Sequence, residues 1–111
     1  DTLLLENLCA ITLYKKYGSG IYYFNRNIEV DFYVPDEGLA VQASYRMSDE
    51  ATLEREIKAL VALNSLYPLK RALIVTYEDE GFVERDGLKI EIVPVWKWVL
   101  KVKHANYAPS W

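Results

Sequence analysis

The segment from residue 28 to residue 45 constrains the fold most strongly, because two strand-like runs flank a short loop. IEVDFYV and LAVQASY are rich in β-branched and aromatic residues, and the intervening PDEG is typical of a turn. If these four residues form the loop, antiparallel pairing places Asp31 opposite Gln42. In the same register, Glu29 faces Ser44. The sequence therefore predicts a β-hairpin with one specified pairing.

This register separates the polar from the apolar side chains of the hairpin. Val30 and Phe32 point to the same apolar face, which also carries the apolar residues of the second strand. The opposite face carries four polar side chains: Glu29, Asp31, Gln42 and Ser44. One interpretation is that they are ordinary solvent-facing residues, since antiparallel hairpins commonly have one polar face. The chemical alternative is a cation site, because carboxylate and amide oxygens are suitable ligands for Mg²⁺.

The remainder of the sequence predicts an α/β domain. The first predicted helix is apolar over most of its circumference, which is typical of a largely buried helix. The segment RALIVTY has the composition of a strand that is buried on both faces. In chain order, the predicted elements are a helix over 2–17, strands over 21–24, 28–34 and 39–45, a helix from the N-cap Ser48 to about Asn64, strands over 71–77, 81–85 and 88–93, and a helix that Pro94 opens.

Length and charge limit the domain organisation and the partners. A chain of 111 residues has the size of one domain, 1–111, and its single cysteine, Cys9, excludes an internal disulfide. The net charge of −3 disfavours a free-standing, nonspecific DNA-binding protein. The absence of a long apolar run and of a secretory signal indicates a cytoplasmic protein without a membrane partner. The chain starts at Asp1 without a methionine, and we interpret this as a cut point within a longer protein, with N-terminal processing as the alternative.

Several strings, in their order along the chain, resemble a known family. They are LLENLCA, YYFNRNIEVDFYV, LAVQASYRMS, RALIVTYED and IEIVPVWKWVL. Together they resemble the PD-(D/E)xK, or restriction-endonuclease-like, superfamily. More narrowly, they look like a C-terminal domain of unknown function that follows an AAA+ ATPase module in many bacterial and archaeal proteins. The resemblance implies an αβββαβ core with a central mixed sheet, extended here by a C-terminal hairpin and helix.

The resemblance also assigns site positions. Glu6 matches the helix glutamate of the family, Asp31 the strand aspartate and Gln42 the (E/Q) position, and these three residues are the implied Mg²⁺ ligands. Ser44 stands where an active nuclease has a lysine, whose ammonium stabilises the charge that develops on the phosphate. Gln42 in place of a glutamate also weakens the metal site. The loss of the charged ligand and of the ammonium together predicts a rate lower by several orders of magnitude. Three cations nearby in the sequence are candidates to replace it: Arg46, Arg55 and Lys58. An alternative interpretation of Glu6 is a helix-start acid that the helix dipole favours.

We therefore expect a non-catalytic accessory domain of an AAA+ ATPase, with a degenerate active site, that recognises nucleic acid or protein. One alternative is a Mg²⁺-dependent DNA nuclease that uses Glu6, Asp31 and Gln42 with a displaced cation. Another is a structural module for dimerisation or regulation. The expected partners are the ATPase module of the same protein, DNA and a second copy of the chain. The sequence lacks a G-x-x-x-x-G-K-[ST] motif, so ATP would bind only to an N-terminal module outside this chain.

Overall fold

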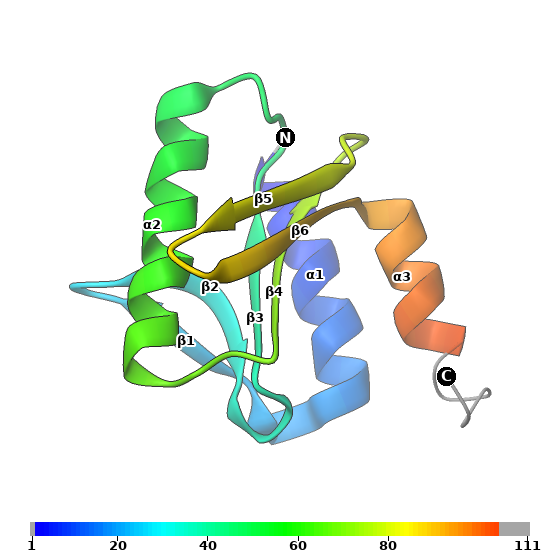
Figure 1. Ribbon diagram of the computed structural model, residues 1–111. Helices are drawn as coiled ribbons and strands as arrows, with labels where there is room; N and C mark the ends of the chain where they lie inside the picture. Colours follow the sequence, from blue (N-terminus) through cyan, green and yellow to red (C-terminus); the bar gives the residue numbers. More distant parts are fainter. Residues whose placement is uncertain (1, 105–111) are drawn as a thin grey trace.

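The computed structural model describes residues 2–104 and shows a six-stranded mixed sheet between two helical layers (Figure 1). The predicted α/β class is confirmed. None of the described helices is long and apolar enough to cross a membrane. The elements in chain order are α1 (Thr2–Tyr17), β1 (Tyr22–Asn25), β2 (Glu29–Val34), β3 (Leu39–Ala43), α2 (Glu50–Leu66), β4 (Arg71–Thr76), β5 (Gly81–Arg85), β6 (Leu88–Pro94) and α3 (Val95–His104).

The order of strands in the sheet is β1-β2-β3-β4-β6-β5. Strands β1, β2 and β3 form an antiparallel meander, as the sequence predicts, whereas β3, β4 and β6 run parallel to one another. The hairpin of β5 and β6 turns at Asp86 and Gly87, which both have positive φ. Positive φ at both central residues is what the tightest hairpin turns require, and Asp-Gly supplies it.

Helices cover both faces of the sheet, α2 on one face and α1 with α3 on the other (Figure 1). Parallel strands are stable only when both of their faces are covered, and β3 is accordingly buried at all five positions. We call the two packed groups the α1-side cluster and the α2-side cluster. The α1-side cluster includes Leu5, Cys9, Leu13, Phe32, Val41 and Trp98, and the α2-side cluster includes Val30, Tyr33, Ile57, Leu60, Leu63 and Ile74.

The loop between β2 and β3 has the predicted length, and the pairing beside it has the predicted register. Val34 pairs with Leu39, and Phe32 pairs with Val41. The short 3-10 turn Pro35–Glu37 forms the loop and ends at Gly38, whose φ is 58°. Such a left-handed conformation favours glycine, because a Cβ atom makes it unfavourable for other residues.

The prediction that Val30 and Phe32 of β2 point to the same face of the sheet is wrong. Tyr22 of β1 pairs with Tyr33, but Phe24 pairs with Val30, so β2 contains one extra residue in this stretch. Such a bulge changes which side of the sheet the following side chains face. As a result, Val30 lies in the α2-side cluster and Phe32 in the α1-side cluster. The hairpin therefore has no single apolar face and no single polar face.

The prediction that the first helix is largely buried is also wrong. Only three residues of α1 are buried, namely Leu5, Cys9 and Leu13. Leu4, Leu8 and Ile11 are 68%, 40% and 54% exposed. The sheet and α3 cover one side of α1, and no other described element covers the opposite side (Figure 1).

Several predicted boundaries also differ from the structure, and Pro94 ends β6 instead of opening α3, which begins at Val95. The N-cap of α2 is Asp49 rather than Ser48, because the Asp49 carboxylate accepts a hydrogen bond from the backbone N–H of Thr52. The third strand ends at Ala43 rather than Tyr45. The backbone of Ser44 and Tyr45 still bonds to Val75 of β4 and to Tyr77 just after it, at 2.9 and 3.4 Å, and the chain then leads toward α2.

Candidate functional site

Asp31 and Gln42 lie side by side, and the side chain of each is hydrogen-bonded to the backbone of the neighbouring strand. The Asp31 N–H donates to Gln42 Oε1 at 2.8 Å, and the Ala43 N–H donates to Asp31 Oδ2 at 2.8 Å. Gln42 Nε2 donates to the Glu29 carbonyl at 3.0 Å. Each strand thus bonds through a side chain to the backbone of its neighbour. We call this group of Glu29, Asp31, Gln42 and Ala43 the β2–β3 joint.

The joint forms where backbone pairing between the two strands stops. The paired positions end at Phe32 and Val41, so the backbone groups beyond them need other partners. Gln42 is 1% exposed, and a buried amide is costly unless both its oxygen and its nitrogen have partners. The Asp31 N–H donates to the amide oxygen and the amide nitrogen donates to the Glu29 carbonyl, so both requirements are met. Gln42 Nε2 also donates a hydrogen bond to the backbone carbonyl of Glu56 in α2, at 3.4 Å.

Acidic side chains from both helical layers surround Asp31. The pKa of Asp31 is raised to about 6, mainly by burial and also by the negative charges of Glu6 and Glu29, against the lowering effect of the hydrogen bond from the Ala43 N–H. Glu6 comes from α1 and lines the same open cavity as Asp31, about 310 Å³ in volume. Because its neighbours are negative, the Asp31 carboxyl binds a proton more readily than an ordinary aspartate.

Glu56 of α2 lies with Glu6, Glu29 and Asp31 in what we call the acidic group, and the sequence analysis did not identify it. Burial and then the charge of Asp31 raise its pKa to about 7, while a hydrogen bond from Ser44 and the charge of Arg55 lower it. The Glu56 Oε2 atom is buried and has no hydrogen-bond partner. Residue 56 is three positions after Leu53, on the inner side of α2. This helical spacing could have placed Glu56 on the inner side of α2, whereas its position beside Asp31 depends on how α2 packs on the sheet.

Ser44 occupies the lysine position without a cation. The Ser44 hydroxyl donates to the Arg46 carbonyl at 3.4 Å, and its N–H donates to the Val75 carbonyl of β4 at 2.9 Å. The side chain is buried, with 3% of the residue exposed. A serine hydroxyl carries no charge, so it cannot supply the positive charge that a lysine would bring to this position.

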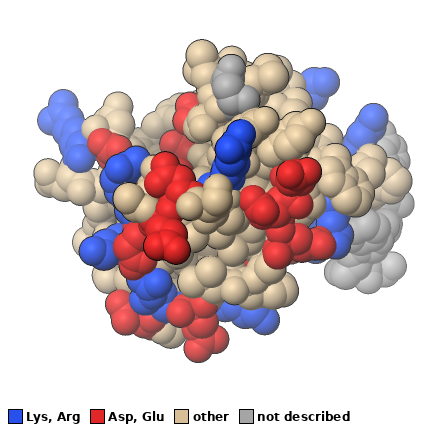
Figure 2. Space-filling view, turned by 90° about the horizontal axis from the view of Figure 1, so that it is seen from above, with Lys and Arg blue, Asp and Glu red and all other residues tan. Residues whose placement is uncertain are grey.

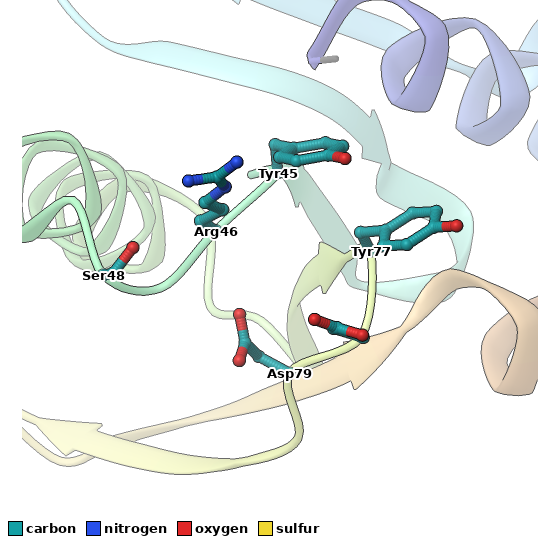
Figure 3. A pocket seen from close by; sticks show the side chains of 6 residues that line it. Tyr45, Arg46, Ser48, Tyr77 and Asp79 are labelled. Atoms are coloured by element: carbon teal, nitrogen blue, oxygen red, sulfur yellow. The ribbon is translucent and has the colours of Figure 1, made fainter.

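Arg46 lies at a separate pocket, next to the ends of β3 and β4 (Figure 3). Its guanidinium carbon is 5.5 Å from the centroid of the Tyr45 ring, which itself stacks on Tyr77 with centroids 5.4 Å apart. The pocket has a volume of about 370 Å³ and is lined by Tyr45, Arg46, Ser48, Tyr77, Glu78 and Asp79. Asp31 and Gln42 do not line it. Arg46 therefore interacts with an aromatic ring instead of the acidic group.

The other two candidate cations, Arg55 and Lys58, lie on α2 and act on two different acids. The charge of Arg55 lowers the pKa of Glu56, and the charge of Lys58 lowers that of Glu54. The charges that shift the pKa of Asp31 come from Glu6 and Glu29, and both are negative. Among the described residues, Arg55 acts on Glu56, and no cation shifts the pKa of Asp31 itself.

The site residues do not fit a magnesium ion as they are arranged. Within residues 2–104, no group of three Asp, Glu, His or Cys side chains is placed to hold a metal. The predicted ligand atoms Asp31 Oδ2 and Gln42 Oε1 each accept a backbone N–H. A cation that displaced these two N–H groups would break hydrogen bonds that hold the β2–β3 joint together.

Cys9 of α1 lies near Asp31 and Glu6, but its thiol has no nucleophilic character. It is fully buried, and burial together with the charges of Asp31 and Glu6 raises the pKa of its thiol to about 12. A thiol with such a pKa stays protonated at neutral pH, whereas the thiolate is the reactive form. Cys9 is therefore a packing residue, as expected for a lone buried cysteine.

Comparisons with known proteins give one similar sequence. No family model matches the chain, and no solved structure matches it. An uncharacterized protein of the archaeon Methanocaldococcus jannaschii, MJ1544, is 37% identical over 110 residues. The match covers 87% of this chain and 24% of the archaeal protein. The chain thus spans about a quarter of the length of this relative.

Proposed function

We propose that this chain is a non-catalytic accessory domain of a cytoplasmic AAA+ ATPase, with a restriction-endonuclease-like fold, and that it recognises another protein. The observation that carries the proposal is the bonding of Gln42, whose amide connects two backbone groups of β2 across the joint. Residues at nuclease-like positions thus have a structural role. The length of the M. jannaschii relative, about four times the matched region, is consistent with a domain that accompanies other modules.

The chemistry of the joint supports a non-catalytic role. Phosphodiester cleavage by a metal site requires ligand oxygens that are free to bind the ion, and a charge that stabilises the transition state. Here the oxygens of Asp31 and Gln42 accept backbone N–H groups, and Ser44 contributes no charge. The neighbouring acid Glu56 has a pKa of about 7, so it carries a proton for much of the time at neutral pH.

The distribution of charge favours a protein partner over nucleic acid. Nucleic-acid binding relies on Lys and Arg side chains gathered on one face. Figure 2 shows a face on which acidic and basic side chains are interspersed, and the chain has a net charge of −3. In contrast, α1 exposes apolar residues at helical spacing, including Leu4, Leu8 and Ile11. Exposed apolar surface of this kind typically marks a contact with another protein.

A nuclease assay tests the proposal. The purified chain is incubated with plasmid DNA and single-stranded DNA in the presence of Mg²⁺ or Mn²⁺, and we expect no cleavage. Metal-dependent cleavage that Asp31→Ala abolishes would overturn the proposal and establish the nuclease. The matched control is Glu84→Gln, which removes an acid from an exposed position of β5, far along the chain from the joint.

A further inference from the structure

A groove runs between α1 and α3 on the outer side of the molecule. It has a volume of about 290 Å³. We call it the α1–α3 groove and define it by its lining residues, which are Leu8, Ile11, Thr12, Lys15, Lys16, Val99, Val102 and Lys103. None of the predicted catalytic residues lines it, so it is separate from the β2–β3 joint.

The apolar residues of the groove follow helical spacing on both walls. Leu8 and Ile11 are three residues apart on α1, and Val99 and Val102 are three residues apart on α3. Leu4, one turn before Leu8, extends the exposed stripe toward the start of α1. With a rise of about 1.5 Å per residue, the stripe from residue 4 to residue 15 is roughly 16 Å long. That length corresponds to about three turns of a partner helix.

Three lysines give the groove a positive charge. Lys15 and Lys16 lie in the last turn of α1, and Lys103 lies in the last turn of α3. Among the eight described residues that line the groove, none is acidic. The chain as a whole carries a net charge of −3, so this positive region contrasts with the rest of the molecule. A partner that fits the groove should therefore combine apolar and acidic groups.

We infer that the α1–α3 groove binds an acidic amphipathic helix of a partner protein. The inference rests on the proposed recognition function and names the chemistry of the partner. Apolar side chains of the partner, spaced at i, i+3 or i+4 and i+7, lie between Ile11 and Val99, and its carboxylates pair with Lys15 and Lys103. Recognition of an amphipathic helix in an apolar groove is a common mode of peptide binding.

The shape of the surface favours a helix over a membrane or a nucleic acid. A groove with an apolar floor between two helices complements a cylinder with one apolar face. A membrane-binding helix instead presents its apolar face to a broad, flat surface. Nucleic-acid recognition would place cations along the whole surface, whereas the lysines here gather at the final turns of α1 and α3.

The test uses two fluorescein-labelled synthetic helices with the same leucine spacing. One helix carries glutamates at all other positions, and the second carries lysines there. Fluorescence anisotropy is expected to show saturable binding of the acidic helix with a Kd of about 1–100 μM, and at least tenfold weaker binding of the basic helix. Ile11→Glu should weaken binding of the acidic helix by at least about tenfold. The matched control is Phe82→Glu, because Phe82 is 63% exposed on β5, outside the groove.

A charge reversal sharpens the test. In the double variant Lys15→Glu with Lys103→Glu, the preference should change from the acidic helix to the basic one. Because Ile11 is 54% exposed and both lysines are surface residues, these variants should keep the wild-type circular dichroism spectrum and melting temperature. This control separates a loss of binding from a loss of folding.

Several outcomes would overturn the inference. The first is equal binding of the two helices, or binding that Ile11→Glu leaves unchanged. A dimer in sedimentation that Ile11→Glu dissociates would assign the groove to a second copy of the chain. Binding to anionic phosphatidylserine vesicles or to single-stranded DNA that Ile11→Glu abolishes, with no helix binding, would assign it to those ligands. None of these results restores catalysis at Asp31, so the cleavage assay reports separately on the proposed non-catalytic role.

Discussion

At the residue scale, the contact between β2 and β3 beyond the paired positions depends on Gln42. Its side chain satisfies the Asp31 N–H and the Glu29 carbonyl, and all of these groups lie in a partly buried region. Gln42→Ala leaves both backbone groups without partners. Because an unsatisfied buried polar group costs about 1–3 kcal/mol, we expect a loss of about 2–4 kcal/mol in the free energy of unfolding. Urea denaturation measures this loss.

The control for this prediction is Asn7→Ala, which removes an amide from an exposed position of α1. It should change the free energy of unfolding by less than about 0.5 kcal/mol. If Gln42→Ala were as mild as Asn7→Ala, the hydrogen bonds of Gln42 would not be what holds the joint together.

Glu56 makes the stability of the domain depend on pH. Its pKa in the folded state is about 7, above the ordinary glutamate value of 4.5, so the folded state binds more protons than the unfolded state between these two pH values. Stability therefore decreases as the pH rises from about 4.5 to about 7. Asp31, raised to about 6, acts in the same direction. Glu56→Gln should raise stability by about 1–3 kcal/mol at pH 8 and by much less at pH 4.5.

Urea unfolding at the two pH values checks this prediction, with Glu84→Gln as the exposed control. A Glu56→Gln variant that gains no more stability at pH 8 than at pH 4.5 would show that the carboxylate is not destabilised by burial. The control variant should show little difference between the two pH values.

At the scale of elements, Gly38 determines how the loop after β2 meets the start of β4. Its φ is 58°, and its carbonyl accepts hydrogen bonds from the N–H groups of Lys70 and Arg71. A Cβ atom at this position would lie 3.0 Å from Lys70 Cγ and 3.1 Å from Lys70 N. Gly38→Ala should therefore lower the free energy of unfolding by about 1–3 kcal/mol, through backbone strain and this close approach.

The comparison for Gly38→Ala is Gly20→Ala. A Cβ atom at residue 20 meets nothing within 4 Å, and Gly20 lies outside the left-handed region. The change should cost less than about 0.5 kcal/mol in thermal or urea unfolding. Equal costs at the two positions would contradict the role given to the conformation of Gly38.

The α1 helix shows what an element-level pattern leaves open. Its leucines lie around most of the circumference, and such a pattern predicts a helix but not which face is covered. Leu5 and Leu13 contact the sheet, whereas Leu4 and Leu8 remain exposed. The choice depends on where β3 and α3 lie relative to α1, and that position is set by tertiary packing.

At the scale of the whole molecule, one sheet carries both packed clusters. Leu13 belongs to the α1-side cluster and Leu60 to the α2-side cluster, and both are fully buried. Leu13→Ala and Leu60→Ala should each lower the free energy of unfolding by about 2–5 kcal/mol. Because the same strands bear both clusters, either change should destabilise the entire domain as one cooperative unit.

Coincident transitions test this cooperativity. Far-ultraviolet circular dichroism follows all elements, whereas tryptophan fluorescence includes Trp98, which is buried in the α1-side cluster. For Leu60→Ala, on the other face, the two signals should give one midpoint. A fluorescence midpoint that stays at the wild-type value while the dichroism midpoint falls would show that the two faces unfold separately.

Most of the fold could be predicted from local patterns, whereas the site could be predicted only in part. The helices, the turn at Asp86 and the register at Val34 follow from turn residues and from periodicity. Asp31 and Gln42 were predicted to be neighbours, and they are hydrogen-bonded. The backbone targets of their side chains were not predictable, because these targets depend on a bulge in β2 and on the end of pairing at Phe32.

The sequence by itself determined the α/β class, the order of the elements and the absence of a lysine at position 44, because these depend on residue type and local spacing. Only the tertiary structure decided that Val30 and Phe32 lie on opposite faces, that Glu56 joins the acidic group and that one side of α1 stays exposed. Each of these features arises from contacts between segments distant in the chain. Bulges, burial and helix packing create such contacts, and no local pattern encodes them.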